Sequence, residues 1–363
     1  MKLQVTQENL AKALNTVARV ANSRQTLPIL SNVLLKTIDN RLSIAATNLD
    51  IGITHYIGSK IEAPGSITVP ARLTQDFIAN LPDSILQLEL VDNKLHITTD
   101  KYQSTINGIA AEDFPVMPAI SSGTAWSMSA RALKKGLQQV AFAASADDAR
   151  PVLTGVYLHS EGGELYIVAT DSYRLAEKNV GKNKKSINLL VPASAIGDLL
   201  RVMGDKDEQI TVTHDDQQVL FQAGDVSLVA RLIEGNYPDY RKLIPSKFGV
   251  TAKLKREDFI NIAKVSSLFA RESAGSITIK VDSGAKKVSI NSIASQLGEN
   301  TATADAAVKG DGGVTLNSRY LLEALNAFDD EDIELCFNGK LEPCILRSPT
   351  SPDYLHLVMP LRS

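Results

Sequence analysis

Apolar side chains recur with helical spacing at three places, about 123 residues apart. A stripe at i, i+4 and i+7 predicts an amphipathic helix with one face in a core. The three stripes are Leu10, Leu14 and Val17, then Leu133, Leu137 and Val140, then the weaker set Phe259, Ala263 and Ser266. Thr6 and Ser129 precede the first two stripes, where an N-cap is expected. The same helix is therefore predicted three times.

A second helical pattern follows each of these helices, with short strands in between. The second stripes are Leu73, Phe77 and Leu81, then Ala195, Leu199 and Met203, then Tyr320, Ala324 and Phe328. Alternating runs predict strands at Ser31–Thr37, Lys94–Thr98, Glu164–Ala169, Gln209–Thr213 and Lys286–Ile290. Each copy is thus an α+β unit whose two helices cover one face of a largely antiparallel sheet.

Short motifs repeat at the same interval and set the domain boundaries. Residues 42–51 return as residues 165–174, and Phe114-Pro115 returns as Tyr237-Pro238 and again as Met359-Pro360. We predict three similar domains, at residues 1–120, 121–246 and 247–363. Three copies form a short curved array, which closes into a ring only if its ends meet another chain.

Composition excludes several classes of protein. Of 363 residues, 44% are apolar and 22% are charged, which is typical of globular domains and excludes disorder, collagen and a disulfide scaffold. No apolar run is long enough to span a membrane, and residues 1–4 begin no signal peptide, so we expect a soluble cytoplasmic protein. Cys336 and Cys344 lack the spacing of metal ligands and are predicted to be buried.

Basic residues concentrate on the predicted helices although the net charge is −3. Lys12 and Arg19 lie opposite the apolar stripe of the first copy. The second copy has Arg131, Lys134 and Lys135 on a helix without acids, and the third adds Lys253, Lys255, Arg256 and Lys264, diluted by Glu257 and Asp258. Acidic runs such as 329–332 are expected in turns, away from the basic residues. The alternative is an ordinary solvated face, but repetition favours a surface that contacts duplex phosphates without reading sequence.

A search for catalytic chemistry finds little. The five histidines are scattered, and Gly310–Gly313 lacks the pattern of a phosphate-binding loop, so we interpret it as a hairpin loop. Asp147, Asp148 and Asp171 are the only candidates for a hydrolase or nuclease. A monomeric scaffold that binds only proteins is the other alternative. No catalytic residue, metal site or cofactor is predicted.

Four motifs, at residues 24–30, 169–176, 234–240 and 358–362, resemble the bacterial sliding clamp, the β subunit of DNA polymerase III. The resemblance covers the whole chain. It implies the DNA clamp fold, in which three similar domains make half of a ring and a homodimer encircles duplex DNA. It also implies a processivity factor without enzymatic activity, whose partners are the replicative polymerase, repair proteins and a separate ATP-driven clamp loader.

The resemblance further implies functional residues. Arg24 is placed in a DNA-contacting loop, and Arg150 is a weaker candidate in another loop. A pocket for short linear peptides, with Arg174 and Asn317 at its edge facing peptide carbonyls, comprises Leu153, Thr170, Tyr173, Arg174, Leu175, Pro238, Leu243, Asn317, Tyr320, Val358, Met359, Pro360, Leu361 and Arg362. Ile106, Leu268 and Phe269 are placed in the dimer interface. Ser172, Lys242 and Ser363 depart from the residues common in the family.

Overall fold

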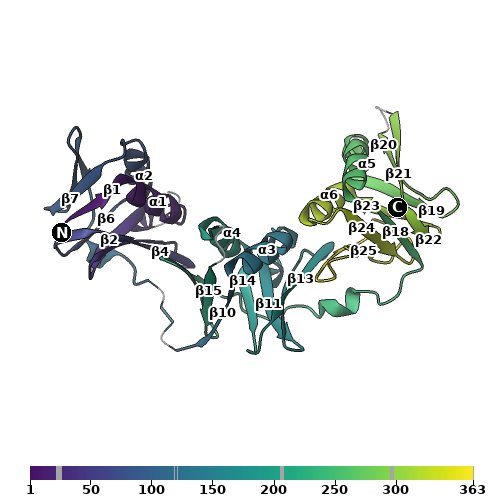
Figure 1. Cartoon of the computed structure of the whole chain (residues 1–363), viewed down its shortest axis with the longest axis horizontal. Coiled ribbons are helices and arrows are strands. Elements are labelled where there is room, and N and C mark those ends of the chain that lie inside the picture. The colour runs from purple at the N-terminus through teal and green to yellow at the C-terminus, as the bar shows by residue number, and fades with distance from the viewer. Residues whose placement is uncertain (22–26, 118, 121, 205–207, 295–297, 363) are drawn as a thin grey trace. The chain divides into compact units, whose positions relative to one another are not determined.

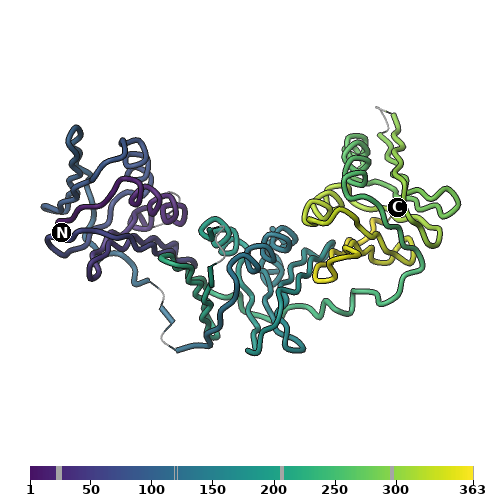
Figure 2. Tube along the Cα trace, viewed as in Figure 1, coloured from purple at the N-terminus to yellow at the C-terminus, as the bar shows by residue number. Residues whose placement is uncertain are grey.

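The computed structural model describes residues 1–21, 27–117, 119–120, 122–204, 208–294 and 298–362 (Figures 1 and 2). It contains two compact units, one of Met1–Arg131 with Gly197–Leu232 and the other of Ala132–Ile196 with Ile233–Ser363. The units follow continuous sheets rather than the sequence repeats. The domain boundaries near residues 120 and 246 therefore stay a prediction.

The first unit contains two antiparallel sheets. One has the strand order β5 (Lys60–Ala63), β1 (Lys2–Thr6), β7 (Ile85–Val91), β8 (Lys94–Thr98) and β9 (Gln103–Asn107). The other has the order β10 (Thr124–Ser129), β15 (Gln209–His214), β16 (Gln218–Ala223), β17 (Val226–Arg231), β4 (Ile51–Gly58), β3 (Arg41–Thr47), β2 (Asn32–Ile38) and β6 (Ser66–Pro70). Helices α1 (Gln7–Val17) and α2 (Ala71–Ala79) lie side by side, and α1 packs on β3 and β4 (Figure 1).

The second unit is built in the same way. Its larger sheet has the order β14 (Asn188–Pro192), β11 (Gly155–Glu161), β12 (Glu164–Thr170), β13 (Arg174–Lys182), β26 (Tyr354–Val358), β25 (Cys344–Arg347), β24 (Asp332–Phe337), β18 (Val250–Lys255) and β22 (Ala307–Lys309). The smaller sheet has the order β21 (Gly298–Asp305), β20 (Lys287–Ala294), β19 (Ser276–Asp282) and β23 (Gly312–Asn317). Helices α5 (Arg256–Phe269) and α6 (Ser318–Ala327) pack together beside it (Figure 1).

The remaining helices lie at the division between the units or in connections. Helices α3 (Ala130–Val140) and α4 (Ala193–Val202) each begin in one unit and end in the other. The short 3-10 turns are η1 (Pro28–Ser31), η2 (Ala111–Asp113), η3 (Ala141–Ala143), η4 (Pro151–Leu153), η5 (Tyr240–Leu243) and η6 (Arg271–Ser273). No helix in the described ranges is both long enough and apolar enough to cross a bilayer.

The structure confirms the first helix of each copy. All nine stripe residues from Leu10 to Ser266 are buried, and the Thr6 side chain accepts a hydrogen bond from the Asn9 amide at 3.4 Å. Predicted strands appear at the expected places, and β8 has the predicted bounds. Antiparallel pairing is found throughout the described ladders, as expected.

One predicted helix face and one predicted loop are wrong. Leu73 is 57% exposed, and α2 instead buries Ala71, Thr74 and Ile78. A polar residue is tolerated there because the Thr74 hydroxyl donates to the Pro70 carbonyl at 2.7 Å. The segment 310–313 is no hairpin, since β22 and β23 on either side of it belong to different sheets.

Both cysteines are buried, as predicted. They lie in the neighbouring strands β24 and β25. Burial raises the pKa of the Cys336 thiol to about 12, so the thiol stays protonated and acts as a small apolar side chain.

Candidate functional site

The site is built on a tight turn between β12 and β13. The Thr170 hydroxyl donates to the Arg174 carbonyl at 2.6 Å and accepts from the Ser172 amide at 3.1 Å. Asp171 Oδ1 accepts from the amides of Tyr173 and Arg174, at 2.9 and 3.0 Å. Ser172 has φ of 77°, the left-handed region that favours glycine. A glycine would adopt this backbone conformation without strain.

Arg174 is held inside the protein. Its Nε pairs with Asp171 at 3.1 Å, its Nη1 pairs with Glu323 of α6, and its Nη2 donates to the Phe142 carbonyl at 2.7 Å. The guanidinium carbon also lies 5.3 Å from the Phe142 ring centre and 4.6 Å from that of Tyr320. Only 7% of Arg174 is exposed. Arg174 therefore holds its neighbours in place, and each of its three guanidinium nitrogens has a partner within the protein.

A neutral histidine lies close to this arginine. His356 of β26 is fully buried, and its ring stacks on Phe142 with centres 5.6 Å apart. Burial, and then the positive charge of Arg174, lowers the pKa of His356 to about 3. Tyr354 donates its hydroxyl to the Gln139 carbonyl at 3.0 Å, which joins β26 to α3.

The C-terminal segment runs past the same turn. Arg174 is opposite Val358 in the β13–β26 ladder, and the Met359 amide donates to the Tyr173 carbonyl at 2.8 Å. The Leu361 amide then donates to Thr315 at 2.8 Å, two residues before Asn317. The Asn317 side chain caps α6 through the Arg319 and Tyr320 amides. Its oxygen is therefore committed to the helix.

The predicted pocket residues all belong to the second unit but differ in exposure. The buried ones are Leu153, Thr170, Arg174, Leu175 and Val358, and the half-buried ones are Asn317, Tyr320, Met359, Pro360 and Leu361. The exposed ones are Tyr173, Pro238, Leu243 and Arg362. We call the fourteen residues together the Arg174 surface. Tyr173, at 59% exposure, offers the most accessible large apolar side chain among them.

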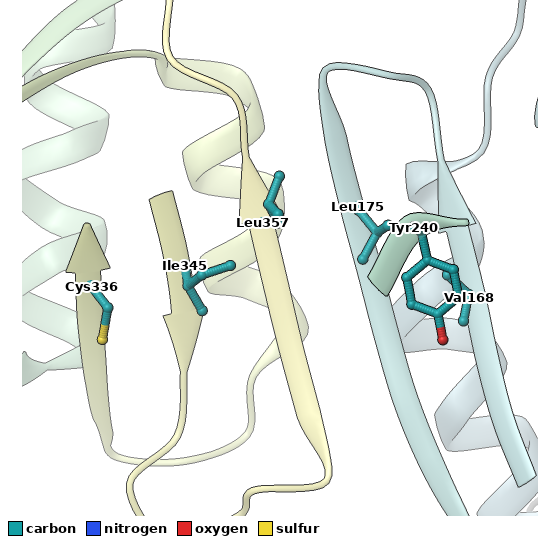
Figure 3. Close-up of a cluster of buried hydrophobic side chains, with 6 residues drawn as sticks. All are labelled: Val168, Leu175, Tyr240, Cys336, Ile345 and Leu357. Atoms are coloured by element: carbon teal, nitrogen blue, oxygen red, sulfur yellow. The ribbon is translucent and has the colours of Figure 1, made fainter. Parts of the chain in front are cut away.

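A cluster of buried side chains includes Leu175 of the Arg174 surface and packs against Met359. Val168 and Leu175 come from β12 and β13, Tyr240 comes from η5, and the other members come from β24, β25 and β26 (Figure 3). Met359 and Tyr237 pack against the cluster. Tyr240 ends the motif at residues 234–240, but its partners lie far from it along the chain and could not be predicted from that motif.

The predicted basic residues differ in how exposed they are to solvent. Lys12, Arg19, Arg131, Arg150 and Lys264 are exposed, and Arg150 donates to the Ser172 hydroxyl at 3.0 Å. Arg24 lies outside the described residues. Lys134 and Arg256 are half-buried.

Two predicted DNA contacts are paired with acids. Lys135 lies 2.7 Å from Asp329, and Lys255 lies 2.6 Å from Glu331 and 3.1 Å from Asp332. The hydrogen bond with Asp329 raises the pKa of Lys135. The acidic run 329–332 is thus next to basic residues, contrary to the expected separation. Sequence alone cannot reveal pairs so far apart along the chain.

One further arginine was missed by the sequence reasoning. Arg201, in the last turn of α4, lines a cleft of about 50 Å³ with Arg19 and Asp198, and it lies 2.9 Å from Asp198. Burial raises the pKa of Asp198, although both arginines oppose this effect. The position of Arg201 in the last turn of α4 could have drawn attention to it, since basic residues are favoured at the C-terminal end of a helix.

The predicted interface residues differ from one another. Ile106 of β9 is only 5% exposed, whereas Leu268 is 53% exposed and Phe269 is half-buried. Each of the four described sheets has two edge strands, and β9 and β21 are two of these eight, so their outer backbone groups have no strand partner. Such edges are templates for pairing with another chain.

Two of the three carboxylates considered for hydrolysis, Asp147 and Asp171, are used locally. Asp171 caps its own turn and pairs with Arg174, and Asp147 accepts from the Ala149 amide at 3.0 Å. In the part of the chain that the structure describes, no three metal-ligating side chains gather. These residues therefore shape loops.

Comparison with family models finds matches along almost the whole chain. Residues 1–118 match the DNA polymerase III beta subunit N-terminal domain, residues 127–239 the central domain and residues 241–362 the C-terminal domain. The chain thus contains the three domains of this family in order.

Individual relatives agree. The beta sliding clamp of Synechococcus elongatus is 33% identical, with 100% of this chain and 99% of the relative covered. The crystal structure of the Bacillus subtilis sliding clamp matches with a TM-score of 0.96 at 28% identity, covering 100% and 99% of the two chains. The sliding clamp of Pseudomonas aeruginosa bound to griselimycin matches with a TM-score of 0.96 at 25% identity, covering 100% of each chain.

Proposed function

Because this chain belongs to the DNA polymerase III β subunit, or sliding clamp, family, we propose that two copies form a ring around duplex DNA and hold replication proteins there. The observation that carries the proposal is the presence of all three family domains, in order, on one chain. The proposed domains are residues 1–120, 121–246 and 247–363. The proposed role is a processivity factor without catalysis of its own.

Ring closure would pair the first domain of one chain with the third domain of the other. Strand β9 supplies an open edge in the first domain, and β21 supplies one in the third. Exposed apolar side chains lie near both edges, at Tyr102, Leu268 and Ile293. Ile106 would support β9 from inside its own unit. Two identical contacts of this kind close a ring by symmetry.

The exposed basic residues would contact DNA through phosphates. Lys12, Arg19, Arg131, Lys264 and Arg201 present positive charge without a base-reading element, which suits contact independent of sequence. Arg24, Lys134, Arg150 and Arg256 complete the proposed set. Lys135 and Lys255 would exchange their carboxylate partners for phosphates on binding.

The Arg174 surface would tether partners by short peptides. Its half-buried aliphatic residues suit an extended peptide with apolar anchors, while Arg174 keeps the turn and α6 in place from beneath. We expect griselimycin, bound by the Pseudomonas aeruginosa clamp, to bind here as well. Tethering raises the effective concentration of a polymerase at the primer end, so that a dissociated enzyme rebinds before it diffuses away.

A plasmid experiment tests the ring. The protein is loaded onto nicked circular DNA by a bacterial clamp loader with ATP, and the DNA is isolated by gel filtration at high salt. We expect the protein to remain with circular DNA and to leave when a restriction enzyme linearises it. Salt-sensitive binding that ignores linearisation would instead indicate ordinary contact. Metal-dependent cleavage of the plasmid, lost in D171A, would indicate a nuclease.

A further inference from the structure

The connection between the second and third domains crosses the β11–β13 sheet and carries two residues of the Arg174 surface. Pro238 and Leu243 are both exposed on it. Four residues separate them, and the middle two are Tyr240, which is buried, and Arg241. The contacts of Tyr240 and Arg241 therefore help to place the two exposed residues.

Tyr240 is held by two polar side chains of the sheet. Its hydroxyl donates to Glu177 of β13, and His159 Nε2 of β11 lies 2.8 Å from the same oxygen. A tyrosine has one hydroxyl proton, and here it is given to Glu177. His159 must therefore donate its Nε2 proton to the tyrosine oxygen. The ring of Tyr240 meanwhile packs in the cluster that contains Leu175 (Figure 3).

Arg241 closes the network from the same connection. It pairs with Glu177 at 3.3 Å and with Glu161 at 2.7 Å, and its guanidinium carbon lies 4.5 Å from the Tyr166 ring centre. His159 is itself stacked between Tyr157 and Tyr166, with ring centres 4.8 and 5.5 Å away. Tyr240 and Arg241 are thus both tied to β11 and β13, by hydrogen bonds in one case and by ion pairs in the other.

The charge states follow from the surroundings. Burial raises the pKa of Glu177, while the hydrogen bond from Tyr240 and the charge of Arg241 oppose the rise. Burial, and then Arg241, lowers the pKa of His159, so the ring stays neutral at pH 7. The titratable or charged groups facing Glu177 are Tyr240 and Arg241 from η5, His159 and Glu161 from β11, and Tyr166 and Glu164 from β12.

We infer that His159, Glu177, Tyr240 and Arg241 are positioning residues that set the affinity of the Arg174 surface for its ligands by fixing Pro238 and Leu243. The inference rests on the proposed peptide-binding function of that surface. A loose connection would have to be ordered when a ligand binds, and that ordering costs affinity. The network holds the connection in place before a ligand binds, so that this cost does not reduce the affinity.

Calorimetric titration with griselimycin tests this in the full-length protein. Tyr240→Phe keeps the ring in its cluster and removes the hydroxyl, so we expect the Kd to rise about tenfold. Thr68→Val is the matched control. It also removes a buried hydroxyl, which donates to the Ile109 carbonyl at 3.0 Å in the first unit. It should lower the melting temperature similarly and leave the Kd unchanged.

A pH series gives a second, independent readout. As pH falls, Glu177 takes up a proton at a higher pH than an ordinary carboxyl and loses its ion pair with Arg241. We expect the affinity of the wild-type protein for griselimycin to fall as this ion pair is lost. Glu177→Gln should bind weakly at every pH, without that step. Should Tyr240→Phe fail to fold, this comparison decides.

The outcomes separate the inference from the function beneath it. If wild type does not bind griselimycin, both the proposed Arg174 surface and the inference are overturned. If wild type binds but Tyr240→Phe and Glu177→Gln bind equally well, with the same pH profile, the inference alone fails. A loss of affinity shared with Thr68→Val would also overturn it, because general destabilisation would then be the cause.

Discussion

The turn after β3 in the first domain and the turn after β12 in the second have the same backbone and different uses. Thr47 donates its hydroxyl to the Ile51 carbonyl at 2.9 Å, as Thr170 does to Arg174 at 2.6 Å. Each threonine also accepts an amide proton two residues on. Two copies of one sequence motif have therefore kept one hydrogen-bonding scheme.

The next two residues agree as well. Asn48 Oδ1 accepts from two amides, and Asp171 Oδ1 accepts from the corresponding two. Leu49 and Ser172 then have φ of 79° and 77°. An amide and a carboxylate cap the turn equally well, because each offers one suitably placed oxygen.

The two turns differ at their fifth residue and in the strand beside it. Ile51 is opposite Ala230 in the β4–β17 ladder, whereas Arg174 is opposite Val358 in the β13–β26 ladder. Two residues along, the first ladder has Leu228 and the second has His356. At the first junction, where β4 meets β17 beside the turn, apolar side chains pack. At the second junction, where β13 meets β26, Arg174 and its partners form a charge network. We connect this difference with the peptide-binding role proposed for the second junction alone.

Exchanging the fifth residue should have the largest effect. Arg174→Ile gives the second turn the residue of the first, leaves Asp171 without its cation and leaves Glu323 with the longer contact to Arg319 at 3.9 Å. Losing one partner of a buried ion pair costs about 3–5 kcal/mol. We expect urea unfolding to show such a loss and griselimycin titration to show no binding. Arg72→Ala, which removes an exposed arginine 4.0 Å from Asp76 on α2, is the control and should change neither. An Arg174→Ile variant of normal stability would contradict the charge network.

Acid should destabilise the second junction through His356 of β26. The folded-state pKa of His356 is about 3 against 6.5 for an ordinary histidine, so its contribution is present above pH 6.5 and is lost as pH falls toward 3. Between pH 7 and pH 4.5 this group alone should lower the free energy of unfolding by about 2–3 kcal/mol. His356→Leu, which copies Leu228, should remove that part of the pH dependence. Identical pH profiles for the two proteins would show that His356 is not the group involved.

The threonines should show where the two turns are equivalent. Thr47→Val and Thr170→Val each remove a buried hydroxyl that both donates and accepts, which costs about 1–3 kcal/mol. We expect similar losses in urea unfolding for both variants. Only Thr170→Val should weaken griselimycin binding. Equal weakening by both would show that stability, and not the Arg174 surface, controls affinity.

Local pattern predicted the repeated elements because their causes are local. The stripes of α1, α3 and α5 and the Thr6 cap depend on residues within two or three turns, and the turn motif depends on five consecutive residues. The repeat itself told us that Thr47 and Thr170 are equivalent.

The chemistry of the site could not be predicted in the same way. Arg174 is completed by Phe142 and Glu323, 32 and 149 residues away, and Tyr240 is completed by Glu177, 63 residues away. Such partners are chosen by the sheet order and the packing of α6. The same reason explains why Lys135 and Lys255 were expected to be free of acids.

Glycine in place of Leu49 and Ser172 should give the smallest effect and show whether both turns store strain. A residue other than glycine in the left-handed region costs about 1–2 kcal/mol, whereas glycine costs about 0.5–1 kcal/mol in lost backbone freedom. We therefore expect Leu49→Gly and Ser172→Gly each to raise the free energy of unfolding by about 0.5–1 kcal/mol. The bond that Ser172→Gly loses from Arg150 is exposed and adds little. Asp50→Gly, beside Leu49 and with ordinary φ, is the control and should be slightly destabilising. If it were stabilising too, the gain would not come from relief of strain.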